Sequence, residues 1–473
     1  MSHAESPRHS MQELRRSLAA QRGRWLRACL GIAAGGLVLA VGHAAIAPHG
    51  AKRFALSYLV ALAFVLSLSL GALFFVVIQH LTRAGWSVLV RRLAEAMAAN
   101  VIVAALLFVP IGLTVAAGST LIYPWAVWTV PNGDTDAAHH ETLTTKLEER
   151  RTKNEERKGQ GGEMRNRSSF FVLRSSNSAP GVEHHAHHHQ QLDALTLKKR
   201  AWLNPGFYLL RWVIFLVIWS ALGWWYWRLS RLQDDDGDAR HTVRCETLAG
   251  PATLIFAITF ALGAMDLLMS LNPHWYSAVY GVYVFAGAVI GALAALILLV
   301  LGLQRFGVLT DAIGIEHLHD LGKLLFAFVF FWAYLAYSQY MLLWYAHLPE
   351  TVTWLVHRGA STAIPNGWSA LLLVLLFGHF LLPFLGLMSR HVKRRRRWLA
   401  AWAAWLLLAH WLDLLWLVMP EMGPHFMLGG VEIGLLAAVG GLYAAGLVWR
   451  LADGPLVPVG DPRLRDSLAF ENI

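Results

Sequence analysis

The sequence predicts an all-α fold, a polytopic membrane protein with about ten transmembrane helices. The first observation is composition, because 56% of the 473 residues are hydrophobic and only 15% are charged. The second is a recurring apolar run of about 20 residues, the length a helix needs to cross a hydrocarbon core about 30 Å thick. The third is that basic residues gather in alternate connections between these runs, as expected for a chain that crosses a membrane repeatedly.

The first 131 residues are predicted to hold a short cytoplasmic segment and three membrane spans. Residues 1–24 are polar and basic, and the region 25–131 contains spans near 25–46, 54–80 and 91–117. The first apolar run is too long for the apolar part of a signal peptide, and further spans follow it. We therefore expect no cleavable signal in this chain.

A polar insertion follows the third span. Residues 132–200 include the charged run 148–158 and the histidine-rich run 184–189. Low hydrophobicity favours a disordered external segment, which we expect on the periplasmic side. A histidine-rich tract is also able to bind metal, and this alternative stays open without a defined site.

Seven further spans complete the predicted membrane domain, residues 201–450, and a cytoplasmic tail of residues 451–473 ends the chain. These spans lie near 206–226, 250–270, 277–303, 322–346, 367–389, 396–419 and 430–450.

The distribution of Lys and Arg predicts the orientation, because basic residues in short loops resist translocation. Arginines cluster in the N-terminal segment and in the loops at 83–92, 228–244 and 390–397. The alternate loops, at 272–276, 347–366 and 420–428, contain one basic residue in total, Arg358. Both termini are therefore expected in the cytoplasm, with the chain in a bacterial inner membrane.

Charge and cysteine content exclude several classes of protein. The formal net charge of +10 comes from short loops beside apolar spans, not from a soluble basic face with aromatic residues, so we expect no nucleic acid partner. Cys29 and Cys245 are far apart and belong to no CxxC or CxxCH motif. An iron–sulfur cluster or covalently attached haem c held by this chain alone is therefore excluded.

Ionisable residues inside spans are the candidate functional residues, because an Asp at the centre of a membrane helix costs about 2.5 to 3.5 kcal/mol on insertion scales. Asp266 lies near the outer end of span five. His410 and Asp413, in span nine, are three residues apart and share a helix face. His379 lies near the middle of span eight, before Pro383, which frees a backbone carbonyl.

Span seven carries a second polar series. Asp320 and Lys323 lie at its cytoplasmic end, and Tyr334 and Ser338 share a stripe near its middle. Together with the residues of spans five, eight and nine, they are predicted to lie at successive depths across the membrane. Such a series of polar groups suits the movement of a proton in short steps. The alternative is that each group only joins two helices by hydrogen bonds, which are common in bilayers and worth about 0.6 kcal/mol on average.

Two further interpretations concern histidine and aromatic residues. His379 and His410 come close to the requirement for axial ligands of haem b, two histidines on facing helices at matched depth. Arg211, Trp212 and neighbouring aromatic residues near the outer end of span four are expected to form an interfacial belt rather than a binding site.

Four stretches of the sequence carry a family resemblance. They are His319–Phe328 continuing through Phe331–Tyr334 and Ser338–Tyr345, then Met265–Tyr276, His379–Phe384 and Asp413–Pro420. In these stretches the chain closely resembles the F subunit (ActF) of bacterial alternative complex III, a quinol:cytochrome c oxidoreductase. The resemblance covers residues 25–131 and 195–450, and it departs where the polar insertion separates Tyr123–Trp125 from Lys198–Pro205.

The resemblance implies a polysulfide-reductase-like (NrfD-like) subunit with two four-helix bundles and two peripheral helices. It implies partners, namely an NrfD-like membrane subunit, an iron–sulfur subunit and a multihaem cytochrome c, with a terminal oxidase as a further candidate. Haem c and iron–sulfur clusters would belong to those partners. This chain would bind no cofactor alone, apart from a candidate quinol or quinone, and would contribute a proton path or quinone-site architecture. Asp266, Asp320, Lys323, His379 and Asp413 fall within the matching stretches, and His410 precedes one of them.

Two other functions remain open. A stand-alone proton-coupled secondary transporter is disfavoured because no inverted repeat with interrupted helices in matching positions is evident. A purely structural membrane anchor, in which the buried carboxylates have no role, is the third possibility.

Overall fold

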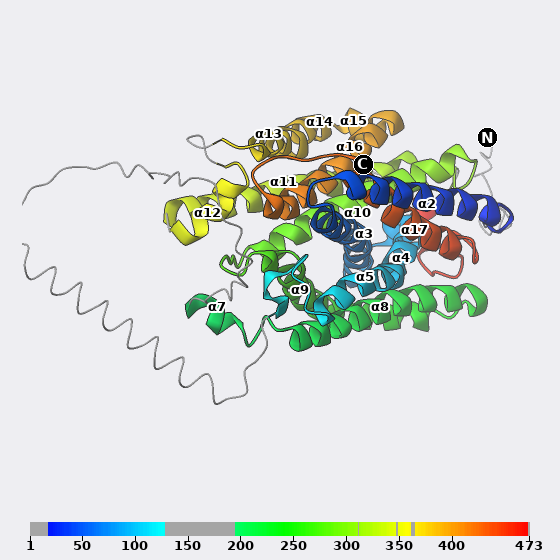
Figure 1. Ribbon diagram of the computed structural model, residues 1–473. Helices are drawn as coiled ribbons and strands as arrows, with labels where there is room; N and C mark the ends of the chain where they lie inside the picture. Colours follow the sequence, from blue (N-terminus) through cyan, green and yellow to red (C-terminus); the bar gives the residue numbers. More distant parts are fainter. Residues whose placement is uncertain (1–17, 128–193, 311, 347–348, 361–364, 472–473) are drawn as a thin grey trace, which may run out of the picture. The chain divides into compact units, whose positions relative to one another are not determined.

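The computed structural model describes residues 18–127, 194–310, 312–346, 349–360 and 365–471 (Figure 1). These residues form helices and no strands, and ten helices are long and apolar enough to cross a membrane. The all-α polytopic fold class is confirmed. The histidine-rich run and most of the predicted insertion lie outside the described residues.

The ten spans correspond to numbered helices, two of which are divided. In chain order the spans are α2 (Arg22–Ile46), α3 (Gly50–Leu81), α4 (Val88–Ala99) with α5 (Val101–Ala116), α8 (Pro205–Asp236), α9 (Arg240–Leu267), α10 (Tyr280–Arg305), α11 (Ile315–Ala346), α13 (Trp368–Val374) with α14 (Leu382–Met388), α16 (Arg396–Val418) and α17 (Gly430–Leu451). Short helices are α7 (Ala194–Lys199), α12 (Pro349–His357), α15 (Arg390–Arg394) and α18 (Leu464–Leu468).

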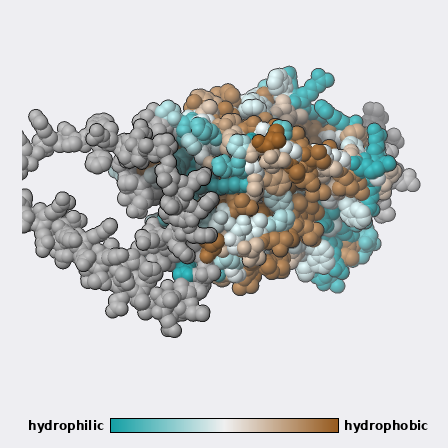
Figure 2. Space-filling model, viewed as in Figure 1, coloured by the Kyte–Doolittle hydropathy of each residue, from teal (hydrophilic) through white to brown (hydrophobic). Residues whose placement is uncertain are grey.

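The chain divides into two compact units. Residues 128–204 form one, of which the structure describes only residues 194–204, including α7. All ten spans belong to the other, residues 1–127 and 205–473. Within this larger unit, hydrophobic residues form a broad band over the helices, and hydrophilic residues gather toward the end at which α15 lies (Figures 1 and 2).

Helices α8 and α9 extend well beyond their apolar runs. The apolar pattern places the end of span four near residue 226 and the start of span five near residue 250, but the helices meet at Asp236 and Arg240. Backbone hydrogen bonds continue a helix where the side chains become polar. The turn comes at Gly237, whose φ of +67° is a left-handed conformation that glycine adopts without strain.

Two spans are interrupted in the middle. Span three changes from α4 to α5 at Asn100, whose side-chain amide donates to the backbone oxygen of Tyr443, 2.9 Å away. Span eight contains a π-helical segment, η5 (Leu375–Leu381), between α13 and α14. Pro383 follows this segment and has no N–H to bond the carbonyl of His379, four residues earlier. Single π-helical turns inside α-helices are frequent at functional sites.

Helix α3 lies at the centre of the packing and is buried along most of its length. It contacts α4, α5, α8 and α9, and it also contacts α10, α16 and α17. Helix α10 in turn contacts α11 and α16, while the first and last spans, α2 and α17, pack on one another. Because α3 packs against both groups, the division into two four-helix bundles with two peripheral helices stays a prediction.

Candidate functional site

Asp413 is the centre of a buried polar site between α10, α11 and α16. Its carboxylate accepts a hydrogen bond from the Tyr283 hydroxyl at 2.5 Å and one from the Trp332 indole nitrogen at 3.3 Å. Only 2% of the residue is exposed, and it forms no ion pair among the described residues. The described donors to this carboxyl group are both neutral. Asp413 is therefore a group inside the membrane domain that is able to take up or release a proton.

His379 joins this site through Trp332. The two ring centroids are 4.1 Å apart with the ring planes tilted by 34°, and His379 is fully buried. Neither ring nitrogen of His379 has a hydrogen-bond partner in the described part of the chain. Because an unsatisfied buried imidazole is costly, these nitrogens are available to a proton or a water molecule.

His410 occupies the same face of α16 as Asp413, as the spacing predicts. Its Nε2 lies 2.8 Å from the hydroxyl oxygen of Ser67 on α3. That hydroxyl also donates to the backbone oxygen of Phe64 at 2.7 Å. A hydroxyl has one proton, so a Ser67 that donates to Phe64 receives the Nε2–H of His410. The Nδ1 atom then carries a lone pair, and no described residue donates to it.

Glycines of α10 make room for these groups. A β-carbon at Gly291 would lie 2.6 Å from a ring carbon of His410, closer than real β-carbons approach. A β-carbon at Gly287 would lie 3.1 Å from His410 Nδ1 and 3.7 Å from an Asp413 carboxylate oxygen. The imidazole and the carboxylate therefore face the same point on α10, and packing explains both glycines.

Asp266 belongs to a different site. Arg211 of α8 holds its carboxylate with two hydrogen bonds, of 2.7 and 3.0 Å, and both residues are buried. Next to this pair, the hydroxyl of Tyr123 donates to the backbone oxygen of Leu267. Desolvation by burial raises the pKa of Tyr123. The expected interfacial belt at Arg211 and Trp212 is wrong, because both side chains are buried among α5, α8 and α9.

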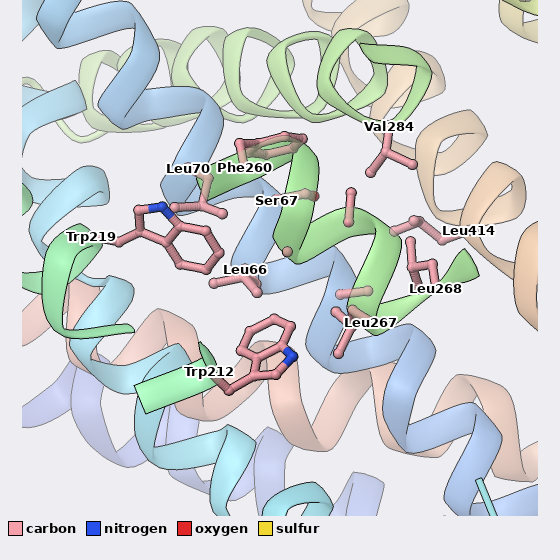
Figure 3. A pocket seen from close by; sticks show the side chains of 13 residues that line it. Leu66, Ser67, Leu70, Trp212, Trp219, Phe260, Leu267, Leu268, Val284 and Leu414 are labelled. Carbon is pink, nitrogen blue, oxygen red and sulfur yellow. The ribbon is translucent and has the colours of Figure 1, made fainter. Parts of the chain in front are cut away.

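A small cavity of about 30 Å³ lies between the Asp266 and Asp413 regions (Figure 3). Leu267, next to Asp266, and Leu414, next to Asp413, both line it, as does Ser67. A cavity of this size has room for at least one water molecule. The other lining side chains are apolar, among them Trp212 and Trp219, so no chain of polar side chains crosses it.

Asp320 and Lys323 lie at the predicted cytoplasmic end of α11. The Lys323 ammonium is 2.5 Å from the Asp320 carboxylate, and the Lys323 side chain is 46% exposed. Lys393 of α15 lies close by, over the ring of Phe326. Burial lowers the pKa of Lys393, and the charge of Lys323 lowers it further. At this end of α11, Lys323 therefore pairs with Asp320, while Lys393 lies against an aromatic ring.

Tyr334 and Ser338 do not join the buried site. Tyr334 is 59% exposed and Ser338 is partly exposed, whereas Leu335 and Gln339 of the same helix are buried. Of the eight residues predicted to form a proton path, the structure thus brings His379, His410 and Asp413 together. The other five occupy three separate places, and the path itself stays a prediction.

The sequence pattern does not predict a large cluster of buried charges in the described part of the chain. Arg91 binds Glu95 at 3.2 Å and also pairs with Asp461, while Arg92 lies 2.7 Å from Asp234. From the sequence, these arginines are expected to be loop residues that predict the orientation of the chain, and their burial and pairing are not predicted. The i, i+4 spacing of Arg91 and Glu95 was the available signal, whereas the two aspartates are distant in sequence.

The described residues contain no group of three or more His, Cys, Asp or Glu placed to hold a metal ion. Trp332 fills the space beside His379, and Ser67 and Gly287 pack against His410, so the two imidazoles face protein groups. Axial ligation of haem b does not fit this packing. No protein-family model matches the chain, and no curated protein matches it significantly.

Proposed function

We propose that this chain is an integral membrane subunit of a respiratory quinol:acceptor oxidoreductase of the alternative complex III type, in a bacterial inner membrane. It carries no redox centre itself and contributes a proton path, quinone-site architecture or both. Its partners are an NrfD-like membrane subunit, an iron–sulfur subunit and a multihaem cytochrome c. Electrons pass to cytochrome c or to a terminal oxidase.

One observation carries this proposal. Trp332, His379 and Asp413 come from three of the stretches on which the family resemblance rests, and their side chains meet at one buried site. Tyr283 completes the site from a fourth helix. A carboxylate with only neutral donors is a poor choice for joining helices, because an amide or hydroxyl does so at lower cost.

Purification with associated proteins tests the proposal. The chain is recovered from native membranes in mild detergent through an affinity tag, and the eluate is analysed by mass spectrometry and by haem and iron assays. Recovery with multihaem, iron–sulfur and NrfD-like partners supports the proposal. A colourless single species contradicts it.

A proton-coupled secondary transporter is the second candidate, and the π-helical interruption at His379 favours it, because transporters use broken helices near the bilayer centre. The same purification separates the two functions. A single species that moves protons in vesicles only when a solute gradient is imposed would establish the transporter.

A further inference from the structure

Tyrosines cluster on the outward face of α11. Tyr334 is 59% exposed and Tyr337 is 63% exposed, and Tyr340 and Tyr345 continue the exposed series. Outside α11, Tyr276 is the one exposed tyrosine among the described residues, and it lies in a loop. Among the described spans, α11 is therefore the one that carries exposed tyrosines.

The depth of Tyr334 and Tyr337 follows from their neighbours. The ring of Trp332 contacts the ring of His379, which lies near the middle of the 21-residue span Trp368–Met388. A helix rises 1.5 Å per residue, so Tyr334 and Tyr337 lie roughly 3 and 8 Å along the axis from Trp332. Both therefore lie inside a hydrocarbon core about 30 Å thick, whose surfaces are about 15 Å from its centre.

A phenol hydroxyl at this depth needs a hydrogen-bond acceptor. Leaving a hydroxyl unpaired in hydrocarbon costs roughly 4 to 8 kcal/mol on a cyclohexane scale, and membrane tyrosines normally lie at the interfaces. Neither Tyr334 nor Tyr337 has a hydrogen-bond partner among the described residues. By contrast, the buried hydroxyls of Tyr123, Tyr208 and Tyr283 are all paired.

Exposed positions near the middle of α8, α9 and α2 include aliphatic side chains. Val217 of α8 is 62% exposed, and exposed residues in the middle of α9 and α2 include Ile258 and Val38. These side chains have no polar atom to satisfy in lipid. The difference indicates that the outer face of α11 meets protein and the faces of α8, α9 and α2 meet lipid.

Charge at the end of α11 distinguishes between possible occupants. Arg394 of α15 pairs with Glu316 at the start of α11, so the basic loop lies beside this end of the helix. Arg390 and the run Arg395–Arg397 are exposed there and have no ion pair with described residues. Two copies of this chain packed through α11 about a two-fold axis would bring these arginines near one another, which is unfavourable.

We propose that the outward face of α11 is the docking surface for a transmembrane helix of a different polypeptide. That helix supplies hydrogen-bond acceptors level with Tyr334 and Tyr337, and acidic side chains opposite the basic loop. The identity of this polypeptide as another subunit of the same redox complex rests on the proposed function, whereas the surface itself depends only on the chain spanning a membrane.

Site-specific photocrosslinking in native membranes tests the surface. A benzophenone amino acid replaces Tyr334 in one variant, Tyr337 in a second and Val217 in a control, in the full chain. We expect a discrete adduct with another membrane polypeptide at Tyr334 and Tyr337 and none at Val217. Adducts with lipid alone, with a second copy of this chain or with the chain's own insertion would overturn the proposal.

The hydrogen bonds are tested by removing the hydroxyls. The double variant Tyr334→Phe/Tyr337→Phe keeps the apolar rings, and we expect recovery of the crosslinked partner in mild detergent to fall at least about fivefold, equivalent to about 1 kcal/mol. Tyr276→Phe, which removes an exposed loop hydroxyl, should leave recovery unchanged. Equal recovery with both variants would show that the hydroxyls do not bind the partner.

The two proposals fail in different ways. A crosslinked partner that carries no relation to redox proteins leaves the α11 surface in place and removes the proposed function. Co-purifying haem and iron–sulfur proteins, together with no crosslink from Tyr334 or Tyr337, leaves the function and removes the α11 surface.

Discussion

At the scale of single residues, Asp266 and Asp413 differ in what surrounds them. Arg211 neutralises Asp266 through two hydrogen bonds, so this pair is suited to joining α8 and α9. Asp413 has the hydroxyl of Tyr283 and the indole of Trp332 instead. A change of protonation at Asp413 leaves both donors in place, and this makes Asp413 the better candidate for a proton-handling group.

We predict that Asp413→Asn preserves assembly and lowers quinol oxidation or proton translocation by about tenfold or more, the range of general acid–base effects. Asparagine keeps the shape and one acceptor for Tyr283, so loss of the ionisable oxygen is the main change. Turnover and the proton-to-electron ratio are measured in reconstituted vesicles. Asp235→Asn, at an exposed position at the end of α8, is the matched control. An unchanged ratio with full quinol oxidation in Asp413→Asn would remove the role.

Arg211→Met is predicted to destabilise the membrane domain by about 3 to 5 kcal/mol, because it removes the two hydrogen bonds of a cation from a buried carboxylate. Replacing Asp266 with Leu in the same chain should recover most of this loss, since the pair then becomes apolar. Thermal unfolding of the purified protein in detergent measures both variants. If the double variant is less stable than Arg211→Met, the pair has a role beyond mutual neutralisation.

How far the candidate site could be predicted also depends on residue type. Asp413, His410 and His379 stand out in the sequence because charged and imidazole groups are rare in apolar runs. Tyr283, Ser67 and Arg211 do not stand out, because tyrosine and serine are common in membrane helices and Arg211 lies near a span end. Their pairing with distant residues appears only when the helices pack.

At the scale of elements, apolar runs predict each span because helix is the main way to satisfy the backbone in lipid. The same pattern misplaces the ends of α8 and α9, since residues 227–236 and 240–249 are helical without being predominantly apolar. It also does not reveal the π-helical segment Leu375–Leu381, although Pro383 indicates that a carbonyl nearby is free. Helix ends and helix irregularities depend on backbone hydrogen bonds more than on hydropathy.

Close packing of α2 on α17 provides a test at this scale. A β-carbon at Gly434 would lie 2.6 Å from the backbone oxygen of Gly36, while a β-carbon at Gly440 on the same helix meets nothing within 4 Å. We predict that Gly434→Ala lowers the thermal unfolding temperature, because the helix backbones must move apart. Gly440→Ala should leave it unchanged or raise it, since alanine favours helix by up to about 1 kcal/mol. Equal effects of the two substitutions would contradict tight packing.

At the scale of the whole molecule, the segment after α17 joins helices that are far apart in the chain. Asp461 pairs with Arg91 of α4, Arg463 lies 2.5 Å from Glu246 of α9, and the Ser467 carbonyl lies 3.0 Å from His317 Nε2 of α11. The sequence predicts a cytoplasmic tail at 451–473, and its polar composition gives no sign of these contacts. Such long-range ion pairs depend on the assembled fold.

We predict that Asp461→Asn lowers the thermal stability of the chain, because Arg91 then keeps only Glu95 as a buried partner. Asp466→Asn, five residues later, is the control, since Asp466 is exposed and forms no ion pair with described residues. Thermal unfolding and limited proteolysis of the C-terminal segment measure the difference. Identical behaviour of the two variants would show that the tail contact contributes little to the stability of the folded chain.

The pairing of α2 with α17 also bears on how the chain is made. Helix α2 leaves the ribosome well before α17, and apart from α17 it packs mainly against α3. The face of α2 that carries Gly36 therefore lacks its α17 partner until the eight intervening spans have been inserted. A chain that stops before α17 therefore leaves the close-packing face of α2 exposed to lipid, so the position of α2 is settled only after α17 has been inserted.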